Sequence, residues 1–244
     1  MKQISYQIIG YLYTGYEKYM KRYILQITFL LTTIVTYSQE LSQVTFTVGT
    51  NLSFFSFRTD QEIMIRISDE GKMLEWGTDP GPGRYYSDPR KLQTYLGRVE
   101  YFGQEYDSVF RGKVKSIGTC TFTYYGKYET AAKIGKLKTI GRVAVDYYDN
   151  YEDASFKGKI KYAGSVLFSY YSSFENDAFR GKLKSVNNSS ITYYSTFDDK
   201  AIAGRIKSIG SFEYILYSSY ERYHGSLKFG SVTQNINGIV YIIM

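Results

Sequence analysis

The sequence predicts an all-β protein, most of it a repetitive antiparallel β-meander of 23-residue hairpin units. Aromatic-rich pairs recur every 23 residues, and glycines recur at the same interval. Short segments between them alternate basic and aliphatic side chains with a period of two, as strands do. Self-similarity at such a fixed period indicates one supersecondary unit that is copied and stacked. The pairs begin at Tyr101, Tyr124, Tyr147, Tyr170, Tyr193 and Leu216, and the glycines are Gly112, Gly135, Gly158, Gly181, Gly204 and, after 21 residues, Gly225.

The N-terminal stretch has the pattern of an export signal. A basic start at Met20 is followed by the 13 uncharged residues 23–35 and then by small residues before Gln39. The uncharged stretch is shorter than the roughly 20 apolar residues that a membrane-spanning helix needs. We therefore expect residues 1–38 to be an N-terminal extension plus signal peptide, with Met20 as the true start. The mature chain is then exported, to the periplasm, the cell surface or the medium, and carries no transmembrane helix.

The composition excludes several classes of protein. Residues 1–38 carry four basic residues and one acidic residue, so their removal lowers the formal net charge from +7 to +4. That excess is well short of the clustered charge of a nucleic-acid-binding protein. Cys120 is the only cysteine and His224 the only histidine, which excludes an internal disulfide and a histidine-based metal cluster. We interpret Cys120 as a buried apolar residue and His224 as a surface residue, and we expect neither an enzyme nor a cofactor.

Residues 39–96 form a non-repetitive β region. Segments 44–48 and 52–57 are rich in strand-forming residues, and segments 62–67 and 72–76 flank a turn and predict a hairpin. The region ends in a proline- and glycine-rich linker. All three prolines lie there, at Pro80, Pro82 and Pro89.

Residues 97–244 form the predicted repeat domain of six units. In the copy at 158–180, a short basic-aliphatic strand precedes a longer aromatic strand and a polar segment closes the unit. Two strands in 23 residues leave room only for tight connections, which favours hairpins. Two copies are shorter by two residues, a change that keeps every side chain on its own face of a sheet. A β-solenoid with one coil per unit and a membrane β-barrel remain alternatives.

The unit resembles MORN-type hairpin repeats, which also have 23 residues with glycine and aromatic residues at set places. The resemblance covers residues 97–244. The glycine spacing within each unit differs from that family, and the usual tryptophan is missing. The chain also resembles uncharacterised, exported, tyrosine-rich bacterial repeat proteins. Both resemblances imply a β-hairpin fold, and neither implies an activity.

Basic residues form the strongest surface signal. They lie at the second and fourth positions of each unit, so stacked units would align them into two ladders on one sheet face. Such ladders keep a sheet soluble and discourage edge-to-edge association. They also form a candidate stripe for polyanions such as acidic glycans or lipopolysaccharide. The stripe comprises Lys113, Lys115, Lys136, Lys138, Lys159, Lys161, Lys182, Lys184, Arg205 and Lys207.

Acidic and aromatic residues recur in the polar segment and in the paired positions. An acidic row, each member directly after an aromatic residue, fits either turn formation or calcium binding. Neighbouring tyrosines of each pair point to opposite faces of a strand, so one ring is expected to pack inward and the other to be displayed, where it can stack on sugars. The acidic row is Glu129, Glu152, Glu175, Asp198 and Glu221.

These patterns predict a non-enzymatic exported β-repeat protein with a binding or scaffolding role, for which the cell surface is a candidate location. The alternative is an outer-membrane or membrane-associated barrel-like protein. A surface glycan or another polyanion is the candidate partner, and nucleic acid is not expected.

Overall fold

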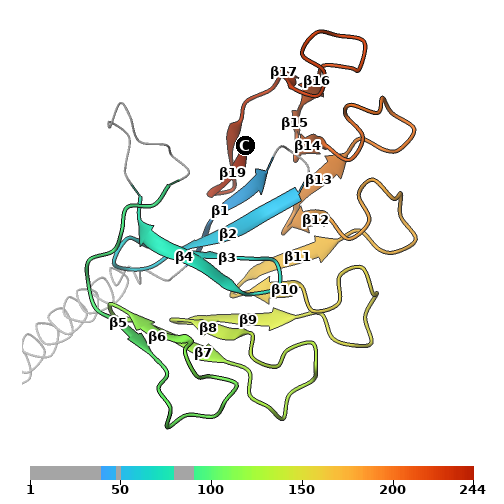
Figure 1. Cartoon of the computed structure of the whole chain (residues 1–244). Coiled ribbons are helices and arrows are strands. Elements are labelled where there is room, and N and C mark those ends of the chain that lie inside the picture. The colour runs from blue at the N-terminus through green and yellow to red at the C-terminus, as the bar shows by residue number, and fades with distance from the viewer. Residues whose placement is uncertain (1–39, 48–50, 80–90) are drawn as a thin grey trace, which may run out of the picture. The chain divides into compact units, whose positions relative to one another are not determined.

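The computed structural model describes residues 40–47, 51–79 and 91–244. The predicted export signal at 1–38 and the three prolines of the linker lie outside these residues. Within them the chain forms strands and no helix, which confirms the all-β class (Figure 1). Among the described residues, no helix has the length and apolar character needed to cross a membrane.

The repeat region forms one 11-stranded antiparallel sheet in which the strands follow one another in chain order (Figure 1). Its edges, β5 and β15, each have a neighbour on one side only, so the sheet is an open meander. The predicted meander is confirmed, and neither alternative arrangement of the units is formed. The strands are β5 (Val99–Tyr101), β6 (Val114–Ile117), β7 (Cys120–Tyr124), β8 (Leu137–Ile140), β9 (Val143–Tyr147), β10 (Ile160–Ala163), β11 (Val166–Tyr170), β12 (Leu183–Val186), β13 (Ser189–Tyr193), β14 (Ile206–Ile209) and β15 (Phe212–Glu213).

Each unit is a hairpin followed by a long loop. In the third unit, β10 and β11 are joined by a two-residue turn that starts at Gly164, with φ of 61°, a conformation that favours glycine. The loop from β11 to β12 ends at Gly181, where φ is 71°. A Cβ atom on Gly181 would lie 2.7 Å from the carbonyl oxygen of Ser155 in the preceding loop. The recurring glycine therefore permits both a left-handed backbone and close stacking of successive loops.

A second sheet has six strands in the order β18-β19-β1-β2-β3-β4. The predicted hairpin is confirmed as β3 and β4, which pair antiparallel. The last strand of the chain, β19, pairs parallel with the first, β1, so both ends of the described chain meet in this sheet. The strands are β1 (Glu40–Thr47), β2 (Asn51–Arg58), β3 (Ile63–Ile67), β4 (Met73–Thr78), β18 (Thr233–Ile236) and β19 (Ile239–Ile243); a separate pair is formed by β16 (Ile215–Leu216) and β17 (Leu227–Phe229).

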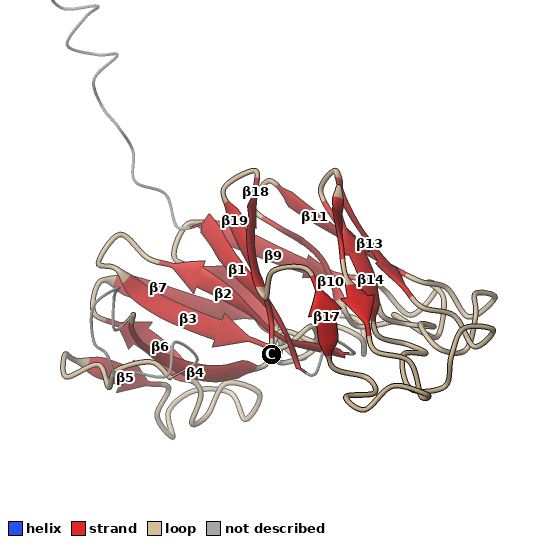
Figure 2. Ribbon diagram, turned by 90° about the horizontal axis from the view of Figure 1, so that it is seen from above, coloured by secondary structure: helices blue, strands red, loops and turns tan. Residues whose placement is uncertain are grey.

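One apolar core lies between the two sheets (Figure 2). The ring of Phe55 on β2 packs against that of Phe168 on β11, with centroids 4.5 Å apart. The β3–β4 turn docks on the third unit, because the carbonyl of Asp69 accepts a hydrogen bond of 2.7 Å from the Ile160 amide and its carboxylate lies 2.9 Å from Lys159 Nζ. The six-stranded sheet thus covers the inner face of the meander and leaves the long loops uncovered.

Candidate functional site

The long loops that follow the second strand of each unit lie side by side at one end of the strands and project together beyond them (Figures 1 and 2). The last of these loops joins β16 to β17, outside the 11-stranded sheet. Five of the long loops carry, 23 residues apart, an aromatic side chain that is almost wholly exposed. We call these residues the loop-tip aromatics. They are Tyr128, Tyr151, Phe174, Phe197 and Tyr220, with exposed fractions of 93%, 97%, 95%, 94% and 95%.

The loops behind these tips are held by the second tyrosine of each pair. Tyr171 donates a hydrogen bond of 2.9 Å to the carbonyl of Ile191 in the next unit, and its ring packs 4.6 Å from that of Phe179 in its own loop. Each loop is therefore anchored both to its own aromatic residue and to the neighbouring unit. The same hydroxyl bond is made by Tyr125, Tyr148 and Tyr194, to Val145, Phe168 and Tyr214.

A second set of contacts joins the loops laterally. The Asp153 carboxylate accepts hydrogen bonds from the amide and hydroxyl of Ser155, and also from those of Ser173 in the next loop. These donors hold the pKa of Asp153 far below its ordinary value. Asp199 joins its loop to Ser219 in the same way. The position recurs every 23 residues as Asp107, Thr130, Asp153, Asn176 and Asp199.

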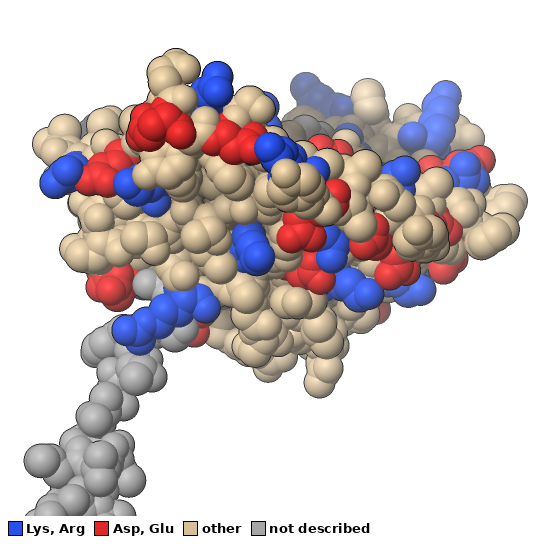
Figure 3. All heavy atoms as spheres, turned by 90° about the horizontal axis from the view of Figure 1, so that it is seen from below, with Lys and Arg blue, Asp and Glu red and all other residues tan. Residues whose placement is uncertain are grey.

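The basic residues at the fourth position of each unit lie on the outer face. Lys184 extends over the Tyr171 ring, 5.1 Å from its centroid, and pairs with Glu175 at 3.4 Å. Lys161 and Lys228 pair similarly with Glu152 and Glu221. On the face that Figure 3 shows, basic and acidic side chains are intermingled. The equivalent residues Lys115, Lys138 and Lys207 also lie over tyrosine rings, those of Tyr106, Tyr125 and Tyr194.

The basic residues at the second position do not belong to that outer face. Lys182 is half-buried, and its Nζ donates a hydrogen bond of 2.7 Å to the carbonyl of Gly204 in the next unit. The two basic rows were expected on one sheet face, but this row instead forms an internal ladder of ammonium-to-carbonyl bonds between units. Lys113, Lys136 and Lys159 make the same bond to Gly135, Gly158 and Gly181, and Arg205 is half-buried too.

The predicted display of one ring per tyrosine pair is also corrected. The second rings, such as Tyr171, are half-buried under a lysine and a loop, so they are not free to stack on a ligand. The displayed aromatics are instead the loop-tip residues, which sequence reasoning noted only as neighbours of the acidic row. Their own period of 23 residues was the signal that could have identified them.

The remaining candidates behave as structural residues. Asp198 and Glu221 accept hydrogen bonds from the amides of Ser195 and Ser218, as turn residues do. Within the described ranges, no cluster of three or more His, Cys, Asp or Glu side chains is arranged to hold a metal ion. Cys120 is buried, and burial raises the pKa of its thiol to about 12.

Comparison of the chain with protein-family models, with curated proteins and with solved structures gave no match.

Proposed function

We propose that this protein is a non-enzymatic, exported binding protein whose row of loop tips holds a linear glycan chain. The observation that carries the proposal is the recurrence of five loop-tip aromatics, each at least 93% exposed. Single exposed aromatic side chains are common on protein surfaces, but an aligned series at equivalent positions indicates a contact surface. The export signal predicted from residues 1–38 supports an extracellular or periplasmic ligand.

The spacing of the tips suits a regularly repeating ligand. Each unit adds two strands, and neighbouring strands lie about 4.7–4.9 Å apart, so successive loops leave the sheet about 9–10 Å apart. The lateral bonds from Asp153 and Asp199 hold neighbouring loops in register. Less ordering entropy is then lost on binding, which favours affinity for an extended polymer.

The chemistry of the tips favours sugar rings over a lipid surface. An aromatic face packs against the apolar face of a sugar, while neighbouring polar groups bond its hydroxyls. Every loop-tip aromatic is followed directly by an acidic residue, for example Glu152 after Tyr151. Glu152, Glu175 and Glu221 each pair with an outer lysine, so acceptors and donors for sugar hydroxyls lie beside the rings. Burying such charged groups in a lipid surface would cost free energy.

The test is a triple variant, Tyr151→Ser, Phe174→Ser and Phe197→Ser. Wild type and variant are compared by co-sedimentation and affinity electrophoresis with linear polysaccharides, both neutral (cellulose, xylan) and acidic (alginate, heparin). An aromatic contact contributes about 1 kcal/mol, so the loss of three rings should weaken binding by roughly 100-fold. Because the rings are exposed, the variant should keep the stability of the wild type to within about 0.5 kcal/mol per site. Phe229→Ser, an exposed aromatic on β17, is the matched control.

The salt dependence of binding distinguishes neutral from acidic glycans. Binding to a neutral chain through the tips should change little between low and physiological salt. Binding to a polyanion through the outer lysines Lys138, Lys161, Lys184 and Lys207 should weaken, because exposed charges are screened beyond about 8 Å at physiological ionic strength. Equal binding by wild type and the triple variant would refute the role of the tips.

A further inference from the structure

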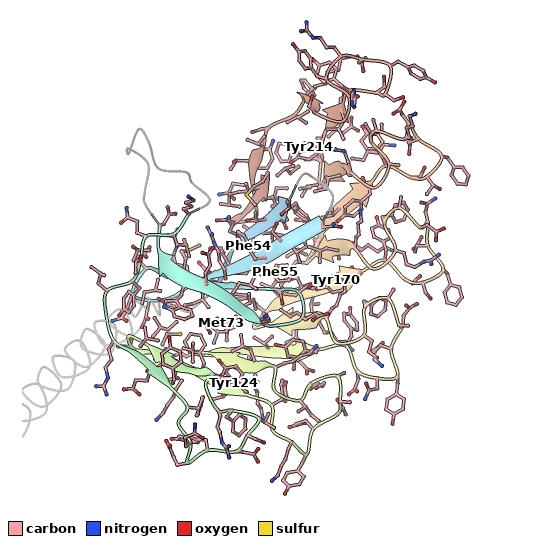
Figure 4. The ribbon with its side chains drawn as sticks, viewed as in Figure 1. Phe54, Phe55, Met73, Tyr124, Tyr170 and Tyr214 are labelled. Atoms are coloured by element: carbon pink, nitrogen blue, oxygen red, sulfur yellow. The ribbon has the colours of Figure 1, made fainter. Side chains whose placement is uncertain are left out.

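A cavity of about 520 Å³ lies away from the loop tips, where the second sheet meets the first two units of the meander. Met73 on β4 and Tyr124 on β7 mark its two walls in Figure 4. Trp76 on β4 and Tyr101 on β5 also line it. Tyr101 is 52% exposed, so the cavity has an aromatic rim that solvent and small molecules can reach.

The charged groups of this cavity are mainly positive. Its lining includes Lys72, Lys113 and Lys136, opposed by the single carboxylate of Glu70. Lys113 and Lys136 hold equivalent positions in consecutive units. Aromatic surface beside a cation is the pattern of a site that orients an anionic group attached to an apolar face.

The two half-buried lysines differ in their counter-charge, and Lys113 has the weaker one. Lys113 and Lys136 donate to the carbonyls of Gly135 and Gly158 and lie 4.9 Å and 5.0 Å from the ring centroids of Tyr124 and Tyr147. Neither forms an ion pair with a carboxylate among the described residues, but the charges of Glu70 and Asp69 act on Lys136, whereas Lys159, their equivalent in the next unit, pairs with Asp69. Burial lowers the pKa of both, because the ammonium ion is partly removed from water. Buried charges are ordinarily paired, so this part of the ladder is suited to accept an anion.

We propose that this cavity binds a small carboxylate-bearing sugar of the uronic acid class. The carboxylate pairs with Lys113, and the sugar ring packs against Trp76 and Tyr101. This site is independent of the loop tips, because none of the loop-tip aromatics lines the cavity.

The chain offers a direct readout, since Trp76 is its only tryptophan. D-glucuronate is titrated into the full chain at constant ionic strength, with D-glucose and acetate as controls, while Trp76 fluorescence is recorded and calorimetry is run in parallel. Glucuronate should give saturable binding, and glucose and acetate should each bind at least about tenfold more weakly, because each lacks half of the recognised groups. Absence of heat and of a fluorescence change up to about 10 mM glucuronate, where a millimolar site would be filled, would overturn the proposal.

Three variants locate the site. Lys113→Gln and Tyr101→Ala should each weaken glucuronate binding by about tenfold or more, the effect of losing a charged or a stacked contact. Lys182→Gln removes the equivalent ladder lysine outside the cavity and should leave affinity unchanged within about twofold. Because Tyr101 is half exposed, its variant stays informative even if Lys113→Gln proves unstable. The assignment would be refuted if Lys113→Gln and Tyr101→Ala both bound glucuronate with wild-type affinity. It would also be refuted if Lys182→Gln lost as much affinity as these two variants.

Discussion

Two lysines in one unit should differ sharply in their contribution to stability. Lys182 and Lys184 are two residues apart and were equivalent members of the predicted stripe. In the structure, Lys182 Nζ is half-buried, donates to the Gly204 carbonyl at 2.7 Å and lies 5.3 Å from the Tyr193 ring centroid. Lys184 is 49% exposed, and its partner Glu175 is 38% exposed. Replacing each with glutamine removes the charge and keeps a polar side chain.

The magnitudes follow from these contacts. A hydrogen bond from a charged donor contributes about 1.5–3 kcal/mol, so Lys182→Gln should lower the free energy of unfolding by about 2 kcal/mol after relief of the ammonium's burial is allowed for. An exposed ion pair contributes only about 0.2–1 kcal/mol, so Lys184→Gln should cost less than about 1 kcal/mol. In a chain of this size, about 2–4 °C of Tm corresponds to each kcal/mol. Lys182→Gln should therefore lower Tm by about 4–8 °C.

The assay is urea unfolding followed by circular dichroism, with a thermal melt of the same samples. The free energy of unfolding should decrease in the order wild type, Lys184→Gln, Lys182→Gln. Its slope against urea concentration should be the same in all three proteins. If the two variants lose the same stability, or if Lys184→Gln loses more, the internal ladder does not hold the units together and the reasoning fails.

Two further predictions concern the buried tyrosines and the recurring glycine. Burial raises the pKa of Tyr214 to about 12 and raises those of Tyr147 and Tyr193 further, so their contribution to stability is fully present below the unfolded-state value of about 10 and is lost as pH rises through the folded values. Part of the tyrosinate absorbance should therefore appear only together with loss of the β-sheet signal above pH 10, and ionisation of every tyrosine in an intact sheet would contradict this. Gly181→Ala should cost more than the roughly 1–2 kcal/mol of a left-handed alanine, because its Cβ would meet the Ser155 carbonyl. Gly112→Ala, with a φ of 73° against 71° and with open space around its Cβ, should cost only that amount. Equal losses in urea unfolding would show that loop stacking does not depend on this contact.

The period of the sequence was enough to predict the hairpin units and their order. Tyr147 and Tyr170, the first residues of two aromatic pairs, end strands as the repeat requires. The two-residue length differences between copies leave each side chain on the same face of its strand. Strict alternation, however, predicts that Leu183 and Ser185 share the buried face. The structure buries Leu183 and Val186 instead, because pairing passes from Ser169–Ser185 to Tyr170–Leu183 and leaves Lys184 as a bulge residue.

That bulge explains why the candidate site was only partly predictable. An extra residue turns Lys184 outward over Tyr171, while Lys182 remains at the strand end and reaches the next unit. A pattern of alternating residues cannot distinguish these two environments, since both positions hold basic residues. The exposure of the loop tips also depends on the loop anchors, which join residues about 20 positions apart in neighbouring units, such as Tyr171 and Ile191.

The six-stranded sheet restricts the number of repeat units that the fold can hold. In an array whose units contact only their neighbours, units add or drop out with little effect on the others. Here the first and last strands of the described chain, β1 and β19, pair with each other, and the sheet that they share packs along the meander through contacts such as Phe55 with Phe168. The number of units must therefore match the width of that sheet. A repeat region of fixed length and fixed twist holds its loop tips at fixed separations. The proposed binding of a linear polymer with regular spacing requires a surface whose contact points are fixed in this way.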